Sequence, residues 1–517
     1  MLRADFFKSN EFFRLVSAAV FLVVIYFFAD GWVVGDVEGR GLLIIAAIIG
    51  GYMAMNIGAN DVANNVGPAV GAAAMTMTSA IIIAGFFEAG GALIAGGEVV
   101  GTIKKGIIDP EMIRDTATFI WAMMAALLAA AIWLNLATVV GAPVSTTHSI
   151  VGGVLGAGIA AGGWNIVNWA TMGKIAASWV ISPVLGAVIA ASVLYLIKNK
   201  IVYKKDKLAE AKKIVPVLLS AMTLVFSTYL ILKGLKKLWK FDFLTASLIG
   251  LGIAVVVYFI IKPLITRAAD KLPNDRASVN KLFAIPLVFA AALLSFAHGA
   301  NDVANAVGPL AAINDALSSG DIATKAAIPL WVMVIGAAGI ALGLALYGPK
   351  LIRTIGSEIT ELDMIRAFCV AMAAAITVII ASQLGLPVSS THIAVGGVFG
   401  VGFLREFLDA NHMMAVAKIR KQLSDDAHDD VDGFLERYES ADILERGELL
   451  AELKKAKKTD AAIFDKAERK RLNKAHKKEL VKRSLVYKIA AAWVITVPAA
   501  ASMSAFFFFT IRGFMLP

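Results

Sequence analysis

Long apolar runs recur along this 517-residue chain and constrain its fold more than any other feature. Hydropathy places them near residues 12–29, 42–57, 78–97, 117–139, 144–161, 175–197, 215–232, 243–261, 281–297, 328–347, 366–384, 388–406 and 488–511. A helix of about 20 apolar residues is long enough to cross a bilayer. Because 58% of the residues are hydrophobic and 17% charged, we predict an all-α polytopic membrane protein with about 12–13 transmembrane helices.

The composition also excludes several classes of protein. A single cysteine, Cys369, rules out a framework of internal disulfides and a thiolate metal cluster. The net charge of +10 does not indicate nucleic-acid binding, because the basic residues gather in loops that flank the apolar runs. The first apolar run is followed by Asp30-Gly31-Trp32 and not by a signal-peptidase site, so we interpret it as a retained helix.

A polar motif occurs twice, each time after an apolar run. It begins at Gly58 as Gly-Ala-Asn-Asp-Val-Ala-Asn-Asn-Val-Gly-Pro and returns at Gly299, differing only where Asn65 is replaced by Ala306. A segment this rich in polar side chains, glycine and proline is costly in lipid unless it faces protein or a water-filled cavity. The duplication predicts one site built from two halves, as in secondary transporters.

Two further blocks repeat in the same order. Pro-Val-Ser-Thr-Thr-His begins at Pro143 and Pro-Val-Ser-Ser-Thr-His at Pro387, and Lys-Ile-Ala-Ala-x-Trp-Val begins at Lys174 and Lys488. Broken or re-entrant helices are expected at the motif segments, which are the two Gly-Ala-Asn-Asp copies and the two Pro-led segments. The predicted organisation is an extra N-terminal helix (1–40), a first repeat unit (41–197), a central connector with two helices (198–280), a second unit (281–410 and 487–517) and a charged loop within it (411–486).

The charged loop predicts the orientation of the chain. Residues 411–486 are dense in lysine, arginine and acidic residues, whereas the matching loop 162–173 has no charged residue. The positive-inside rule places 411–486 in the cytoplasm. The odd number of spans between the two copies of the motif then makes the repeats inverted, although the lysine-rich loop 233–240 falls on the wrong side in this scheme.

The repeated blocks favour oxyanion binding. Glycine and proline interrupt the helical backbone, and a following serine or threonine caps the new helix start. Such a helix N-terminus offers unpaired N–H groups and partial positive charge to an anion. The buried Asp61 and Asp302 need compensation, which sodium ions or protons held at both carboxylates would supply. Anion and carboxylates would then be tolerated together only when cations accompany them.

The duplicated Gly-Ala-Asn-Asp-Val-Ala-Asn and Pro-Val-Ser-Thr/Ser-Thr-His blocks closely resemble the inorganic phosphate transporter (PiT) family. The resemblance covers both repeat units and implies a sodium- or proton-coupled phosphate symporter with inverted repeats, about twelve spans and frequently a homodimer. It implies a coupling-cation site at Asn60, Asp61, Asn301 and Asp302, and phosphate binding by Asn64, Ser145, Thr146, Thr147, Asn305, Ser389, Ser390 and Thr391.

Other interpretations stay open for these residues. Either aspartate could cap a helix, and the hydroxyls could bond only to their own helices. His148 and His392 are candidate proton carriers or neutral packing residues. Glu88 either binds a cation or forms a pair inside the bundle.

The primary hypothesis is a phosphate symporter of the cell membrane, an inner membrane in a bacterium, that works by alternating access without cofactors. Na+ is favoured over H+ because two carboxylates and many neutral oxygens suit a hard cation. The alternatives are a carrier of the same architecture for sulfate or another tetrahedral oxyanion, and a passive anion channel. A membrane-embedded enzyme is disfavoured because the motifs contain no metal cluster and no nucleophile–base pair.

Overall fold

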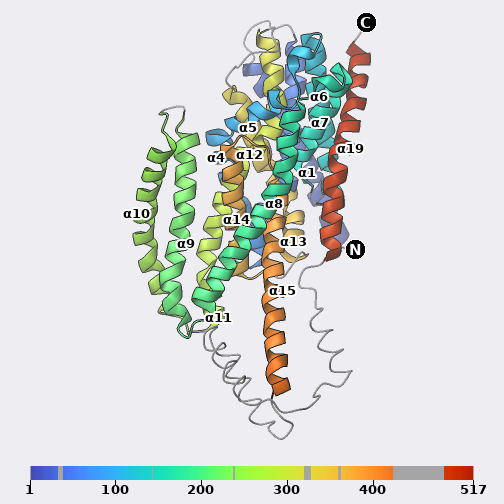
Figure 1. Cartoon of the computed structure of the whole chain (residues 1–517). Coiled ribbons are helices and arrows are strands. Elements are labelled where there is room, and N and C mark those ends of the chain that lie inside the picture. Colours follow the sequence, from blue (N-terminus) through green and yellow to red (C-terminus); the bar gives the residue numbers. More distant parts are fainter. Residues whose placement is uncertain are drawn as a thin grey trace.

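The computed structural model describes residues 2–32, 39–142, 144–236, 239–319, 328–358, 362–422 and 483–515. These residues form a bundle of helices without a named β-strand (Figure 1). The long helices are α1 (Leu2–Trp32), α2 (Arg40–Asn60), α4 (Met77–Ala95), α6 (Thr116–Val140), α7 (Thr146–Gly162), α8 (Trp169–Ile197), α9 (Lys207–Tyr229), α10 (Phe243–Ala269), α12 (Ala284–Ser319), α13 (Leu330–Glu358), α14 (Met364–Gln383), α15 (Ser390–Gln422) and α19 (Arg483–Met515). The short ones are α3 (Ala63–Gly71), α5 (Gly97–Gly101), α11 (Arg276–Leu282), two 3₁₀ turns (Pro110–Met112 and Trp164–Ile166) and three π-helical turns (Thr102–Gly106, Lys198–Val202 and Leu230–Gly234).

The polytopic membrane fold is confirmed. Among the described residues, eleven helices are long and apolar enough to cross a membrane, and each corresponds to a predicted span. The two remaining predicted spans, 144–161 and 388–406, are the Pro-led segments, which fold as α7 and the first half of α15. Helix α15 continues to Gln422, and residues 423–482 of the predicted charged loop lie outside the described residues.

The two copies of the polar motif fold differently. In the first copy α2 ends at Asn60 and α3 begins at Ala63, and the turn between them is closed by two short-range bonds, Asn64 N to Asp61 O (3.0 Å) and Asn65 N to Val62 O (3.0 Å). The second copy lies inside the continuous helix α12, so a break at that motif is a wrong prediction. A glycine weakens a helix by only about 1 kcal/mol and does not end it by itself.

The motif glycines instead allow two close helix crossings. A Cβ at Gly58 of α2 would lie 1.9 Å from the carbonyl oxygen of Ile340 in α13, and one at Gly299 of α12 would lie 2.2 Å from that of Glu88 in α4. Small residues at such crossings let helix backbones pack tightly in membranes. Each motif helix thus packs on the helix that follows the other motif.

The Pro-led helices also pack on helices of the other half. A Cβ at Gly156 of α7 would lie 2.1 Å from the carbonyl oxygen of Ala501 in α19, and one at Gly400 of α15 would lie 2.2 Å from that of Ala187 in α8. Helix α7 therefore packs on the last helix of the chain, and α15 packs on a helix of the first half. The two halves are intertwined and enclose one shared centre.

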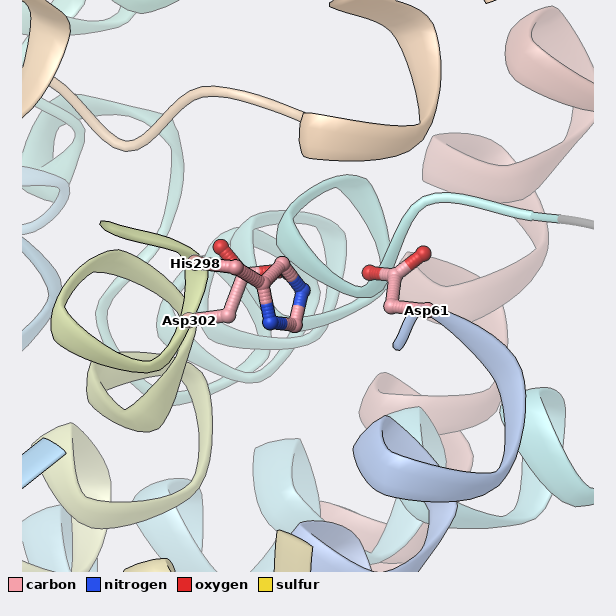
Figure 2. Close-up of side chains that lie close together, drawn as sticks. All are labelled: Asp61, His298 and Asp302. Atoms are coloured by element: carbon pink, nitrogen blue, oxygen red, sulfur yellow. The ribbon is translucent and has the colours of Figure 1, made fainter. Parts of the chain in front are cut away.

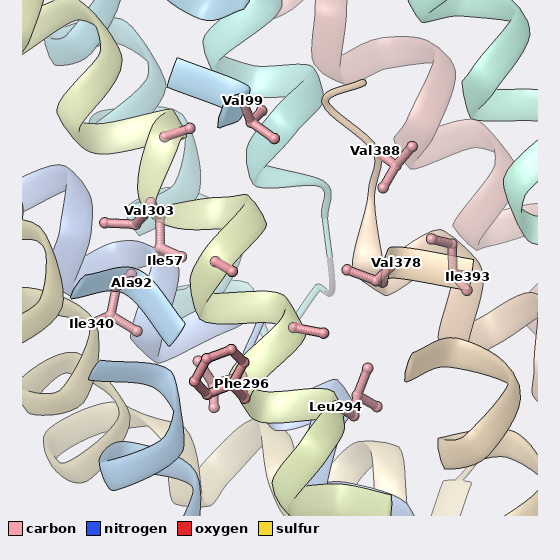
Figure 3. Close-up of a cluster of buried hydrophobic side chains, with 14 of the residues drawn as sticks. Ile57, Ala92, Val99, Leu294, Phe296, Val303, Ile340, Val378, Val388 and Ile393 are labelled. Atoms are coloured by element: carbon pink, nitrogen blue, oxygen red, sulfur yellow. The ribbon is translucent and has the colours of Figure 1, made fainter. Parts of the chain in front are cut away.

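Apolar side chains surround that centre. Phe296 and Val303 of α12 lie on the side of the helix where Ile57 of α2 and Ile340 of α13 are also buried, and Leu294 lies on its other side (Figure 3). Helices α9 and α10 form a hairpin that stands at one side of the bundle (Figure 1). Since α10 carries many exposed apolar side chains, its surface is suited to lipid.

Candidate functional site

The Pro-led segments place two helix N-termini at the centre. Gly141 and Gly385 adopt positive φ angles of 75° and 65° just before the prolines, a conformation that glycine reaches without a Cβ penalty. Ser145 then caps α7 by accepting a bond from the backbone of His148 (3.1 Å), and Ser389 accepts one from His392 (3.2 Å) at the start of α15. Serine caps were expected at these positions, and both are present.

The aspartates of the two motifs meet at these helix starts. The hydroxyl of Thr146 lies 2.7 Å from Oδ2 of Asp61 and 3.1 Å from Oδ2 of Asp302. The hydroxyl of Thr391 bonds to the other carboxylate oxygen of Asp61. Each aspartate is fully buried. Residues far apart in the sequence thus form one cluster of two carboxylates and two hydroxyls.

Two asparagines extend the cluster across the halves. The amide of Asn64 donates to Thr391 (2.8 Å). That of Asn305 donates to Thr146 (3.1 Å) and Thr147 (3.2 Å). Because each amide reaches the Pro-led helix of the other half, both halves contribute to one arrangement of polar groups.

Asn60 and Asn301 lie beside the cluster but bond elsewhere. The amide of Asn60 donates to Thr138 Oγ1 (3.0 Å) and to the carbonyl of Ala142 (3.2 Å). In the matching place, Asn301 donates to Ser382 Oγ (3.0 Å) and to the carbonyl of Leu386 (3.4 Å). Each asparagine therefore holds the bend that precedes its own Pro-led helix.

One functional candidate was missed in the sequence. His298 is fully buried, and its Nδ1 lies 2.9 and 2.8 Å from the two carboxylate oxygens of Glu88. Its Nε2 lies 3.0 Å from Oδ2 of Asp302. The repeat has Ile57 at the matching position, so a comparison of the two copies overlooks this histidine. His298 precedes Asp302 by four residues, which puts both side chains on one face of a helix. This spacing could have identified the histidine as a neighbour of the aspartate.

Glu88, from α4, completes this part of the site. Asn65 donates its amide to Glu88 Oε1 (2.7 Å), which joins the carboxylate to α3 as well as to His298. Glu88 is thus a member of a buried polar network. Figure 2 shows Asp61 at the end of α2 and the neighbouring His298 and Asp302 on α12. One ligand atom from each of these three side chains lies within 4.8 Å of the others, a spacing that could hold a cation.

Several buried oxygens of the cluster have no hydrogen-bond partner among the described residues. They are the side-chain amide oxygens (Oδ1) of Asn64, Asn65, Asn301 and Asn305, Oδ1 of Asp302 and the hydroxyl of Ser390. A buried polar atom without a partner is costly, so clustered acceptors are suited to a cation or to a ligand that donates protons.

His148 and His392 lie one residue beyond the hydroxyls, in the first turns of α7 and α15. Both side chains are buried, and Nδ1 of His148 lies 2.7 Å from Ser145 Oγ. Thr147 spans the two halves by donating its hydroxyl to the carbonyl of Val388 (2.9 Å). All candidate site residues of the two motifs and of the Pro-led helices therefore gather in one region.

Known proteins match this chain over most of its length. The family described as "Phosphate transporter family" matches residues 57–504. A protein of Helicobacter pylori strain J99 named "Putative phosphate permease" is 54% identical over 491 residues, covering 93% of this chain and 92% of the relative. A similarly named Pyrococcus abyssi protein is 41% identical and covers 70% of this chain and 89% of the relative.

A solved structure shares the fold. It is titled "The sodium-dependent phosphate transporter", is 32% identical, and superposes with a TM-score of 0.75 over 92% of this chain and 100% of that chain. The matched family covers both polar motifs and both Pro-led helices. The chain belongs to the phosphate transporter family, a family of transporters and not of enzymes.

Proposed function

We propose that this protein imports inorganic phosphate by symport with Na+, through one central site that both halves share. The observation that carries the proposal is the hydroxyl of Thr146, which lies within 3.1 Å of both Asp61 and Asp302. Since the two carboxylates share one hydroxyl group, a change of charge at either motif acts on the same site.

Phosphate binds at the starts of α7 and α15. Ser145, Thr146 and Thr147 offer hydroxyls and helix-end amides from one half. Ser389, Ser390 and Thr391 offer the same groups from the other. Helix N-termini stabilise oxyanions without a fixed cation, which allows the anion to be released again. The amides of Asn64 and Asn305 hold these hydroxyls in place.

The coupling cation binds at the carboxylates. Asp61 and Asp302 supply negative charge. The side-chain amide oxygens of Asn64 and Asn305, which have no hydrogen-bond partner among the described residues, supply neutral ligands of the kind that hard cations prefer. Asn60 and Asn301 support this site by holding the bends. Without cations, two buried carboxylates and a phosphate would repel one another strongly. This repulsion makes binding of phosphate depend on binding of Na+, with H+ as the alternative.

Burial favours a carrier over a channel. Asp61, Asp302 and the hydroxyl-bearing residues of both Pro-led helices are each no more than 1% exposed. A passive anion channel needs a continuous water-filled path, whereas a carrier passes through closed states. Two observations support alternating access by inverted halves. Asn60 and Asn301 make matching hydrogen bonds before their Pro-led helices, and at the four glycine crossings a helix of one half packs on a helix of the other. A homodimer in the cell membrane, with 411–486 in the cytoplasm, completes the proposal.

The test is uptake of radiolabelled phosphate into proteoliposomes, with an imposed Na+ gradient compared against a pH gradient. We expect uptake that saturates with phosphate, requires the Na+ gradient, and persists in excess sulfate. Uptake driven by the pH gradient alone would assign the coupling to H+. Competition by sulfate at equal concentration, or flux without any cation gradient, would contradict the proposed symport of phosphate.

A further inference from the structure

Four aromatic rings, two from each half, form a continuous chain of contacts beside the starts of α7 and α15. Trp179 of α8 stacks on His148 with ring centroids 3.7 Å apart and planes at 30°. Trp493 of α19 stacks on His392 at 3.6 Å and 31°. The two histidines meet at 4.4 Å and 47°, and this contact joins the first turn of α7 to that of α15.

The side chain of His392 contacts its neighbours through its ring. His392 is 1% exposed, and neither of its ring nitrogens has a hydrogen-bond partner among the described residues. Its ring contacts the ring of Trp493 and, at a steeper angle between the planes, the ring of His148. The interactions that the structure shows for this side chain are contacts between rings.

Two cross-half hydrogen bonds reinforce these ring contacts. The indole N–H of Trp179 donates to the carbonyl of Pro387 (3.3 Å), which belongs to the Pro-led segment of the other half. The hydroxyl of Thr147 donates to the carbonyl of Val388 (2.9 Å), the next residue in that segment. The ring contacts and these bonds join the two helix starts on which the substrate hydroxyls lie.

We infer that His148 and His392, with Trp179 and Trp493, are positioning residues that hold the two halves of the phosphate site in register by contacts between their rings. His148 directly follows Thr147, and His392 directly follows Thr391. A shift between the rings therefore moves the hydroxyls of one half relative to those of the other. This inference rests on the proposed function, because it assigns these rings to the binding of phosphate by that site.

The decisive comparison is His392→Phe against His392→Ala, measured as the KM and maximal rate of sodium-driven phosphate uptake in proteoliposomes. Phenylalanine keeps a ring between Trp493 and His148 and removes the nitrogens. Alanine removes both ring contacts. Because aromatic contacts of this kind stabilise the arrangement of the site, we expect His392→Ala to raise KM by about tenfold. The KM of His392→Phe should stay within about threefold of the parent value. The pH profile of His392→Phe should match that of the parent.

A double variant and a control complete the test. Since His148 and His392 act through their contact, His148→Ala combined with His392→Ala should raise KM less than the product of the two single effects. Ser149→Ala is the matched control. Among the described residues, the hydroxyl of this buried neighbour donates to Ser145 O of the same segment (2.8 Å), so the variant should transport like the parent.

The outcomes separate this inference from the proposed function. A parent protein that takes up no phosphate contradicts the proposed function itself. If the parent transports, the positioning role is overturned by a His392→Phe variant that fails as completely as His392→Ala, or that loses the pH dependence of the parent. It is also overturned by a His392→Ala variant with the KM of the parent.

Discussion

Asp61 and Asp302, one from each half of the chain, share the hydroxyl of Thr146, which lies 2.7 Å from one carboxylate and 3.1 Å from the other. A hydroxyl has one proton and can donate it to only one carboxylate at a time. Two buried carboxylates at such a position repel each other and require a further positive charge or proton. The geometry thus explains why a cation would be needed to complete the site.

Removing this shared hydroxyl should impair transport strongly. Thr146→Val keeps the shape of the side chain but loses the hydrogen bond that the hydroxyl donates to a carboxylate, which is worth about 1.5–3 kcal/mol. We expect phosphate uptake to fall by about 10- to 100-fold. Thr146→Ser keeps the hydroxyl and should stay within about threefold of the parent. Equal uptake by Thr146→Val and Thr146→Ser in proteoliposomes would show that the hydroxyl is not used.

Each aspartate should be required for the response to Na+. Asp61→Asn and Asp302→Asn preserve size but remove one charge from a buried, hydrogen-bonded group, a change that costs about 2–5 kcal/mol. Uptake at a fixed Na+ concentration should therefore fall by about 30-fold or more in either variant. The measurement is initial uptake across a series of Na+ concentrations. If one of the two variants keeps the Na+ dependence of the parent, the cation site lies at the aspartate of the other half alone.

Glu88 should affect the same response through His298. Its carboxylate oxygens lie 2.9 and 2.8 Å from Nδ1 of that ring, whose Nε2 approaches Asp302. Glu88→Gln leaves a side chain of the same shape with one charge less, so we expect a weaker apparent affinity for Na+ at an unchanged amount of folded protein. The control is Thr377→Val, since Thr377 is buried on α14 and, within the described part of the chain, its hydroxyl donates to Ala373 O of its own helix (2.8 Å). A parental Na+ response in Glu88→Gln would assign the glutamate to structure alone.

The sequence could predict the spans and the centre of the site because both depend on local patterns. Apolar runs locate membrane helices, and a serine after Pro-Val marks a helix start, as Ser145 and Ser389 confirm. His298 was missed because it occurs in only one half, so the repeat did not mark it. The stack of His148 on Trp179 could not be foreseen either, since it depends on how α7 and α8 meet in three dimensions.

The break in the second motif was predicted wrongly for a related reason. The motif predicts a helix interruption at Gly299, but the lack of a side chain there allows the close approach of α4, where a Cβ would lie 2.2 Å from Glu88 O. Local propensity cannot tell a glycine that ends a helix from one that admits a neighbour. Only the packing partner, which lies more than two hundred residues away in the chain, decides between them.

Gly299 should therefore be intolerant of even one methyl group. In Gly299→Ala the new Cβ meets backbone atoms of Glu88, which cannot rotate away as a side chain could, so α4 and α12 must separate. Overpacking of this kind costs about 1–3 kcal/mol. We expect a lower midpoint of thermal unfolding in detergent and reduced phosphate uptake, because Glu88 and His298 move apart. Gly252→Ala on α10 is the matched control, since no atom lies within 4 Å of a Cβ there and its unfolding should match or slightly exceed that of the parent. If both alanine variants unfold alike, the close crossing of α4 and α12 does not contribute to stability as the packing indicates.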